Sequence, residues 1–390
     1  MSKKNEDLFL KLPRTILIFF GIWSSPKKFK VLHTLYMLFV MATQYSFLIF
    51  EFIYISNVWS DIDAASEASY LLFTQASLCY KTTVFLRNRH ILSVLLEDMQ
   101  SDIFAAKSDV HEEALRILAV RIRRLCTFFM TSALSTTTLW AMIPLFDDVG
   151  NRSFPFRIWM PVGPEESPNY EIGYVYQVLT IYISAFLFIA VDSTAVSMIM
   201  FGCSELDIII DKIKKIKKTQ WSSKFKSNDR MKLLDENYKI FRDCIQHHQA
   251  VVAFVEKVES TFHANIFFQL SGSVAIICIT GLRISIVEPH SVQFTSMVNY
   301  MVTMLSQLFL YCWCGNELTI RSQELQDELY VCPWYEQDKR FNNSLWIAME
   351  RMKKPIIFKA GHYIPLSRQT FVAILRSSYS YFAVLNQANK

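Results

Sequence analysis

The sequence predicts an all-α, polytopic membrane protein with seven transmembrane helices, a cytoplasmic N-terminus, an extracellular C-terminus, and helices extended into a cytoplasmic anchor bundle. The first observation behind this prediction is the composition, since 52% of the 390 residues are hydrophobic and 14% are aromatic. That is more apolar than is usual for a soluble domain. The second is a set of seven apolar runs of about the 20 residues that a spanning helix needs. The third is the one-sided distribution of Lys and Arg between the loops.

The runs are separated by polar loops that carry most of the charge. A shorter stretch, 15–23, precedes them, and it is interrupted by Gly21 and followed by Lys27 and Lys28 rather than by a small-residue cleavage site. We therefore expect an amphipathic helix at the inner membrane surface there, or a re-entrant segment, and no cleaved signal peptide. The predicted spans are residues 31–55, 64–86, 125–146, 174–203, 261–286, 294–315 and 370–386.

Basic residues set the orientation, because loops rich in Lys and Arg stay in the cytoplasm. Four loops hold 7, 7, 12 and 8 basic residues, namely 1–30, 87–124, 204–260 and 316–369. The opposite loops hold none in 56–63, only Arg152 and Arg157 in 147–173, and none in 287–293. The N-terminus is therefore predicted inside and, after seven spans, the C-terminus outside. A G-protein-coupled receptor has the reverse orientation, and its Asp-Arg-Tyr and Asn-Pro-x-x-Tyr signatures do not occur in this sequence.

The second outer loop, 147–173, contains four prolines that deny it regular structure. It is either a plain surface loop or a lid over a pocket. Asn151 begins an Asn-Arg-Ser sequon in this loop and is the predicted glycosylation site, whereas Asn342 begins one in a predicted inner loop, where glycosylation would not occur.

The long inner loops show helical periodicity of their own. In 205–218 an apolar stripe recurs every three to four residues among lysines, and similar patterns lead into the fifth span over 233–259 and out of the sixth over 318–329. We expect these segments to project from the membrane and pack into a bundle suited to oligomerisation. The lysine run 212–218 is either a solvated face or a contact with anionic lipid.

Five ionisable residues fall within or near the spans, where charge is costly and usually faces protein or water. They are Glu51, Lys81, Asp192, Arg283 and Arg376. Arg376 lies one turn inside the last span, just ahead of a serine-rich stretch, where a water-filled vestibule, an outgoing interface or a salt bridge would accommodate it.

Catalytic and metal-binding patterns are lacking. His247, His248 and His263 do not form the repeated histidine boxes of membrane di-iron enzymes, and no His-Glu-x-x-His, Gly-x-Ser-x-Gly or P-loop occurs. The pair Cys312 and Cys314 lacks the companion ligands of a zinc site. We therefore predict no enzyme, no cofactor, no metal ion and no nucleic-acid partner.

The last third of the chain resembles the insect odorant receptors. The resemblance is carried by Gly-Asn-Glu-Leu-Thr-Ile-Arg-Ser-Gln-Glu-Leu from Gly315, Leu-Tyr-Val-Cys-Pro-Trp-Tyr from Leu329, Pro-Leu-Ser from Pro365, Phe371, and the closing Ser-Tyr-Ser-Tyr-Phe. Length, seven spans, an inside N-terminus and long inner loops agree with it. The family's co-receptor has a large insertion between spans four and five, which 204–260 lacks, so the chain resembles an odorant-specific tuning subunit.

This resemblance implies an odorant-gated, poorly selective cation channel, in which tuning subunits form a heterotetramer with the co-receptor in the plasma membrane of olfactory sensory neuron dendrites. The implied partners are the co-receptor, a small volatile odorant, monovalent and divalent cations, and membrane lipid. The implied regions are 1–30, a cytoplasmic segment; 31–315, six spans with the odorant pocket in their outer half; 316–369, a cytoplasmic anchor; and 370–390, the pore-lining helix and short extracellular tail.

The resemblance also implies where the sites lie. The pocket would lie among the outer halves of spans two to six, and Trp140 is the strongest candidate because it precedes Pro144 by four residues at the right depth. The full set of pocket candidates is Tyr70, Phe73, Thr74, Ser77, Thr137, Thr138, Trp140, Ala141, Tyr176, Thr180 and Ser184. The pore candidates are Arg376, Ser380, Val384 and Ala388.

Two alternatives remain open from the sequence. A gustatory receptor shares this architecture, and its Thr-Tyr, five apolar, Gln-Phe ending is approximated by 380–388 with Ser for Thr and Ala388 for Phe. A membrane transporter would need internal repeats or broken helices, and the sequence shows no clear repeat.

Overall fold

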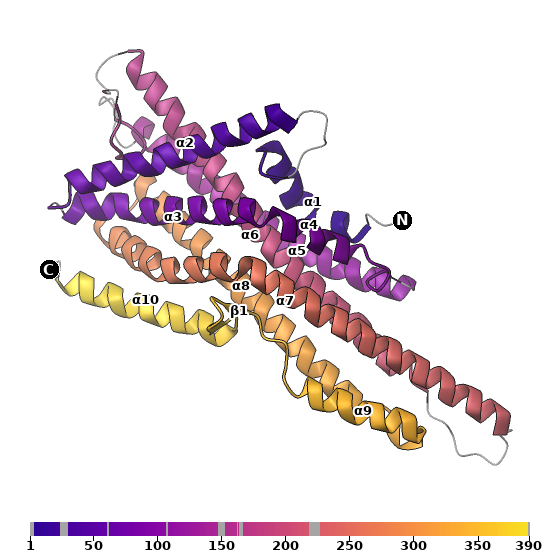
Figure 1. The fold of residues 1–390 in the computed structure, drawn as a ribbon. Helices are drawn as coiled ribbons and strands as arrows, with labels where there is room; N and C mark the ends of the chain where they lie inside the picture. Colours follow the sequence, from indigo (N-terminus) through magenta and orange to yellow (C-terminus); the bar gives the residue numbers. More distant parts are fainter. Residues whose placement is uncertain are drawn as a thin grey trace.

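The computed structural model describes residues 4–23, 30–60, 62–106, 108–146, 153–161, 163, 167–217 and 227–388. These residues form ten α-helices, one short 3-10 helix and a two-stranded hairpin (Figure 1). The bounds are α1 Lys4–Phe19, α2 Lys30–Asn57, α3 Ile62–Arg87, α4 Arg89–Met99, α5 Asp109–Phe146, α6 Asn169–Lys214, α7 Ser227–Ile286, α8 Val292–Val331, η2 Trp334–Glu336, α9 Lys339–Met352, β1 Lys359–Ala360, β2 Ile364–Pro365 and α10 Arg368–Ala388.

Seven long helices coincide with the seven predicted spans: α2, α3, α5, α6, α7, α8 and α10. The predicted all-α, seven-span architecture is therefore confirmed. By length and hydropathy alone, three of the described helices could each cross a membrane, over Val31–Asn57, Asn169–Lys214 and Asp229–Ile286. Some of the others carry polar side chains that face the interior of the bundle, such as Gln75 in α3 and Gln307 in α8.

The helices of the inner loops are continuous with the spans, as the periodicity predicted. The longest, α7, has 60 residues and begins 34 positions before the predicted start of its span at 261. At 1.5 Å per residue it is about 90 Å long. The helix α9 packs against the extended part of α8, and Figure 1 shows this end of the bundle projecting well beyond α10.

The central helix is α6, which contacts α1, α3, α5, α7 and α8. All its residues from Leu187 to Leu206 are buried, so it is apolar nearly all round, as expected of a helix enclosed by others. The first helix, α1, packs directly onto it, and the rings of Phe9 and Phe201 lie 5.6 Å apart edge to face. The N-terminal helix predicted over 15–23 begins earlier, at Lys4, and ends at Phe19, and its apolar face packs on α6 rather than remaining free for the membrane surface.

The short hairpin fixes the start of α10 against α7 and α8. Strand β1 pairs antiparallel with β2, and the turn residue Gly361 has φ +59°, a conformation that favours glycine. Its N–H donates to the carbonyl of His263 in α7 at 3.0 Å. On α8, a Cβ atom added to Gly315 would lie 2.2 Å from the Cβ of Leu366, so only glycine lets the chain approach this closely.

Candidate functional site

A small cavity lies among four helices, in the half of the bundle nearest the α2–α3 and α7–α8 connections. Its volume is about 60 Å³. Since about 10–15 Å³ of such space is enough for one water molecule, the cavity suits a compact molecule of a few non-hydrogen atoms. Its walls come from α3, α5, α6 and α8: Leu71, Thr74, Gln75, Leu78, Ala133, Thr136, Thr137, Trp140, Ile181, Ser184, Ala185, Phe188, Tyr300, Thr303 and Met304.

No wall residue of this cavity carries a formal charge. Its threonine hydroxyls are occupied, because those of Thr136, Thr137 and Thr303 donate to carbonyls one turn earlier in their own helices at 2.9–3.0 Å. The hydroxyl of Thr74 likewise donates to a carbonyl of its own helix. The hydroxyl oxygens of Tyr300 and Thr74 lie 2.5 Å apart. The walls are therefore apolar with a few polar groups that are already held in place.

A second set of hydrogen-bonded side chains joins α2, α3 and α6 beside the cavity. Gln75 donates from Nε2 to Oε1 of Gln44 on α2 at 2.9 Å, and the hydroxyl of Ser184 lies 2.5 Å from the same oxygen. Gln44 in turn donates to the carbonyl of Thr180 at 3.3 Å. These side chains are buried, so their mutual hydrogen bonds stabilise one arrangement of the three helices.

Trp140 is the largest wall residue and is 5% exposed. Its ring packs against those of Tyr70, Phe156 and Tyr300, with centroids 6.1, 5.6 and 5.2 Å away. Its Nε1–H has no hydrogen-bond acceptor among the residues that the structure describes. A buried indole N–H normally has a partner, so this donor is a distinctive feature of the cavity wall.

A larger cavity of about 310 Å³ adjoins the first and shares Leu71 and Trp140 with it. Segment 153–158 of the second outer loop forms part of its wall, as expected of a loop that covers a pocket. Glu51 also lines it, and both carboxyl oxygens of this buried residue lack a hydrogen-bond donor among the described residues.

A buried ion pair lies next to Phe188, a wall residue of the first cavity. The Nζ of Lys81 on α3 lies 2.8 and 3.1 Å from the two carboxylate oxygens of Asp192 on α6. The same carboxylate accepts from the hydroxyl of Tyr311 at 2.7 Å and from Nε2 of Gln307, both on α8. The ammonium also lies 4.1 Å from the ring centroid of Phe188, a cavity wall residue. Burial of both charges is thus compensated by direct pairing and by additional donors.

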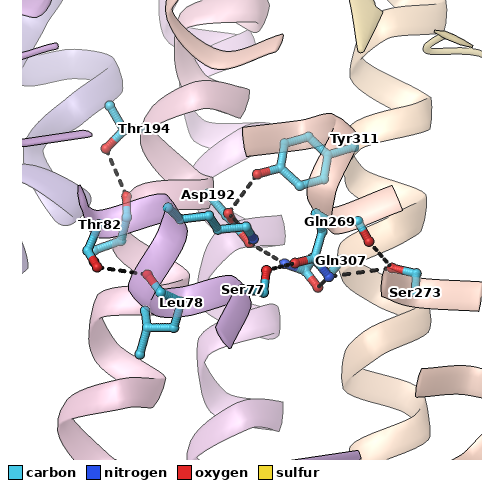
Figure 2. A network of polar contacts seen from close by, with 11 residues as sticks. Ser77, Leu78, Thr82, Asp192, Thr194, Gln269, Ser273, Gln307 and Tyr311 are labelled. Atoms are coloured by element: carbon cyan, nitrogen blue, oxygen red, sulfur yellow. Dashed lines mark hydrogen bonds and ion pairs between the residues drawn. The ribbon is translucent and has the colours of Figure 1, made fainter. Parts of the chain in front are cut away.

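The network continues from α8 to α7. The Oε1 of Gln307 accepts from Nε2 of Gln269 at 2.8 Å, and Oε1 of Gln269 accepts from the hydroxyl of Ser77 on α3 at 2.9 Å. Figure 2 shows these side chains pointing toward one another from separate helices. Four helices below the cavity are therefore joined through one set of polar contacts. Two of them, α7 and α8, are the helices against which α10 packs.

One face of α10 lies on the rest of the chain and the other faces away. Ser378 is buried, the ring of Phe371 packs edge to face on that of Phe309 at 5.8 Å, and Phe382 lies beside Gly281 of α7. On the opposite face, Arg376, Ser380 and Val384 are exposed at a spacing of four residues, which aligns them along the helix. Val384 is 65% exposed.

The structure brings four of the eleven pocket candidates to the first cavity: Thr74, Thr137, Trp140 and Ser184. Tyr70 lines the second cavity. Phe73 is 41% exposed on the outside of α3. The other five candidates make contacts elsewhere. The hydroxyls of Ser77, Thr138 and Tyr176 bond to Gln269, Tyr182 and Ser46, and the carbonyls of Ala141 and Thr180 accept from Tyr174 and Gln44.

Sequence reasoning noted Lys81 and Asp192 separately and missed that they pair. It also missed the wall residues Gln75, Phe188 and Tyr300. A signal for the pair was present, because opposite charges inside spans usually find each other. The predicted glycosylation site Asn151 lies outside the described residues, and so does the side chain of Ala388.

Buried titratable groups also occur in the part of the bundle that projects beyond α10. Burial raises the pKa of Glu205 to about 8, and its Oε2 lies 2.9 Å from Nε2 of His247. Burial, with the nearby charge of Arg351, lowers the pKa of His248 to about 4. His248 is therefore neutral at physiological pH.

Comparisons with known proteins agree with these features. The chain is 25% identical to odorant receptor Or1 of Anopheles gambiae, over 98% of this chain and 95% of that protein. It is also 25% identical to odorant receptor 46a, isoform A, of Drosophila melanogaster, over 99% of each. The solved structure of olfactory receptor OR5 from Machilis hrabei in complex with eugenol superposes with a TM-score of 0.80 over 98% of this chain and 100% of that one, at 14% identity. The family described as 7tm Odorant receptor matches residues 61–379, and this chain therefore belongs to the insect odorant receptor family.

Proposed function

We propose that this chain is the odorant-specific subunit of a ligand-gated cation channel, and that it forms a heterotetramer with the shared co-receptor in the plasma membrane of olfactory sensory neuron dendrites. The observation that carries the proposal is the position of the uncharged cavity, which lies on a network that includes α7 and α8, the helices that hold α10. A small ligand in that cavity acts on the helices that position the pore.

The mechanism is differential binding. An odorant that fits the open arrangement of α3, α5, α6 and α8 better than the closed one shifts the equilibrium toward the open state. The stripe of Arg376, Ser380, Val384 and Ala388 on α10 lines the ion path, with Val384 as an apolar gate, and the opposite face holds the helix on its own subunit. Monovalent and divalent cations pass along this stripe.

The remaining assignments follow the same model. Residues 1–30 form the cytoplasmic segment, 31–315 hold the six spans and the pocket, 316–369 form the cytoplasmic anchor, and 370–390 form the pore helix and tail. Asn151 is the glycosylated residue of the outer loop. Of the eleven candidates named from the sequence, Thr74, Thr137, Trp140 and Ser184 line the pocket, and Trp140 matters most for ligand sensitivity.

The test is a current recording from cells that express this chain alone, the co-receptor alone, or both, exposed to volatile aromatics, esters, alcohols and amines. Cation currents that need both subunits and follow a profile absent from the co-receptor alone support the proposal. Robust currents from this chain alone would instead favour a gustatory-type homomer, and uptake of a solute without current would favour a transporter.

Two substitutions separate the pocket from the pore. Trp140→Ala is expected to change the concentration of odorant that gives half-maximal current, because it removes the largest cavity wall. Val384→Ala is expected to change gating or relative ion permeability for every ligand alike. Reversal potentials and surface biotinylation are measured for both. A Val384→Ala channel altered for one ligand only would contradict the pore assignment.

A further inference from the structure

The cavity contains one hydrogen-bond donor that the protein leaves unused. Among its wall residues, the hydroxyls of Thr136, Thr137 and Thr303 donate to backbone carbonyls, and the amide of Gln75 donates to Gln44. The hydroxyls of Thr74, Ser184 and Tyr300 are likewise within bonding distance of protein oxygens. Only the Nε1–H of Trp140 lacks an acceptor among these donors.

A buried donor without an acceptor lowers the stability of the fold by about 1–3 kcal/mol, because it loses its hydrogen bonds to water and gains none in the protein. A residue that served only to fill space could be Phe or Leu at no such cost. The indole therefore has a use when a ligand supplies the missing acceptor. Trp140 lies on the wall of both cavities, and the smaller one is the uncharged site, since Glu51 and Arg157 line the larger one.

The rest of the wall determines what kind of molecule brings that acceptor. It has no formally charged residue. The nearest charges, Lys81 and Asp192, are bonded to each other behind Phe188. An ammonium or carboxylate ligand would enter without a counter-ion, at a large desolvation cost.

We infer that the cavity selects small uncharged volatiles with a hydrogen-bond-accepting oxygen, such as short ketones, esters and ethers, and that Trp140 Nε1–H donates to this oxygen. The inference rests on the proposed function, since it takes the cavity to be the odorant site. It assigns to Trp140 a role in specificity that packing alone does not supply.

The experiment compares ligands that differ only in the acceptor. 2-Butanone and 2-methyl-1-butene differ only in a C=O against a C=CH2 group, and cyclopentanone and methylenecyclopentane form a cyclic pair of the same kind; all four are compact enough for a cavity of about 60 Å³. Each is applied to cells expressing the co-receptor with the wild-type chain, with Trp140→Phe, or with the control Trp59→Phe, which alters an exposed tryptophan. The same compounds are tested for thermal stabilisation of the purified complex in nanodiscs.

The wild-type channel is expected to respond to the ketone of a pair at about tenfold lower concentration than to the hydrocarbon. A tenfold difference in affinity corresponds to about the free energy that one buried hydrogen bond contributes. In Trp140→Phe this difference disappears, while the response to the hydrocarbon stays within about threefold. The Trp59→Phe channel retains the wild-type difference. Phenylalanine lacks the N–H and is also smaller than the indole, so the hydrocarbon response measures the lost packing and the ratio of ketone to hydrocarbon potency measures the lost donor.

Failure of the inference is distinguishable from failure of the proposed function. Equal potency of ketone and hydrocarbon on the wild-type channel overturns the inference without any variant, and so does a ketone preference that survives in Trp140→Phe. Selective stabilisation by ketones without any current would sustain the ligand class and refute the channel assignment. If no member of either pair stabilises or activates the wild-type complex, the inference is overturned.

Discussion

The buried ion pair between Lys81 and Asp192 gives a prediction whose size follows from its surroundings. Lys81→Met removes the cation but leaves the carboxylate in a fully buried site, with only the uncharged donors of Gln307 and Tyr311. Breaking a buried pair in this way typically costs about 3–5 kcal/mol. We expect the free energy of unfolding of Lys81→Met to fall by about that amount.

The double variant Lys81→Met/Asp192→Asn separates charge from shape. Gln307 and Tyr311 donate to different oxygens of Asp192, so in Asn the amide oxygen accepts from Gln307 and the amide NH2 donates to the hydroxyl oxygen of Tyr311, and no uncompensated charge remains. We therefore expect the double variant to lie within about 1 kcal/mol of the wild type, since neutral replacements of buried pairs are often tolerated.

Unfolding is followed by circular dichroism during titration with sodium dodecyl sulfate in mixed micelles. The matched control is Lys257→Met, because Lys257 and Asp98 are 2.7 Å apart but 43% and 31% exposed. A pair so exposed contributes at most about 1 kcal/mol. The reasoning is refuted if Lys81→Met costs no more than Lys257→Met, or if the double variant is as unstable as the single one.

Three further predictions concern other parts of the chain. Gly315→Ala is expected to displace Leu366 and reduce surface expression or ligand-evoked current, whereas Gly272→Ala, with no atom within 4 Å of the added carbon, leaves both unchanged. Because the pKa of His248 is lowered to about 4, the unfolded chain binds this proton first as pH falls below about 6.5, so stability drops between about pH 6.5 and 4. His248→Gln removes that part of the loss, at most about 1.4 kcal/mol per pH unit, in unfolding titrations across this range. Endoglycosidase treatment is expected to shift the mass of the wild type but not of Asn151→Gln, and an unshifted wild type would contradict the predicted glycosylation.

The sequence predicted the helices and their order because long apolar runs bounded by charge have few alternatives. The sequence predicted the depth of a residue along its helix better than the direction in which its side chain points. Phe73 and Thr74 have the same depth on α3, yet Phe73 faces outward and Thr74 lines the cavity, since adjacent helical residues point about 100° apart. A helix apolar on all sides gives little sign of which side faces which neighbour.

The sequence also did not show which charged residues on different helices contact each other. Lys81 and Asp192 are 111 residues apart, and Glu51 was an equally suitable partner for the lysine by sequence. Only the packing of α3 on α6 places Asp192 beside Lys81 and leaves Glu51 at the second cavity. The candidate Trp140 was found from the sequence, but its unused donor depends on which atoms surround the indole.

The length of α7 has a mechanical consequence. Gln269, where the helix joins the polar network, is 42 residues from its first residue and 17 from its last, which is about 63 Å and about 26 Å. A rigid tilt about that point carries the far tip more than twice as far as the end beside the cavity. Because the two parts of the helix differ in length, the same tilt moves its first residues farther than its last. A fluorescent reporter near Arg230 would therefore show a larger odorant-driven displacement than one placed at the pocket.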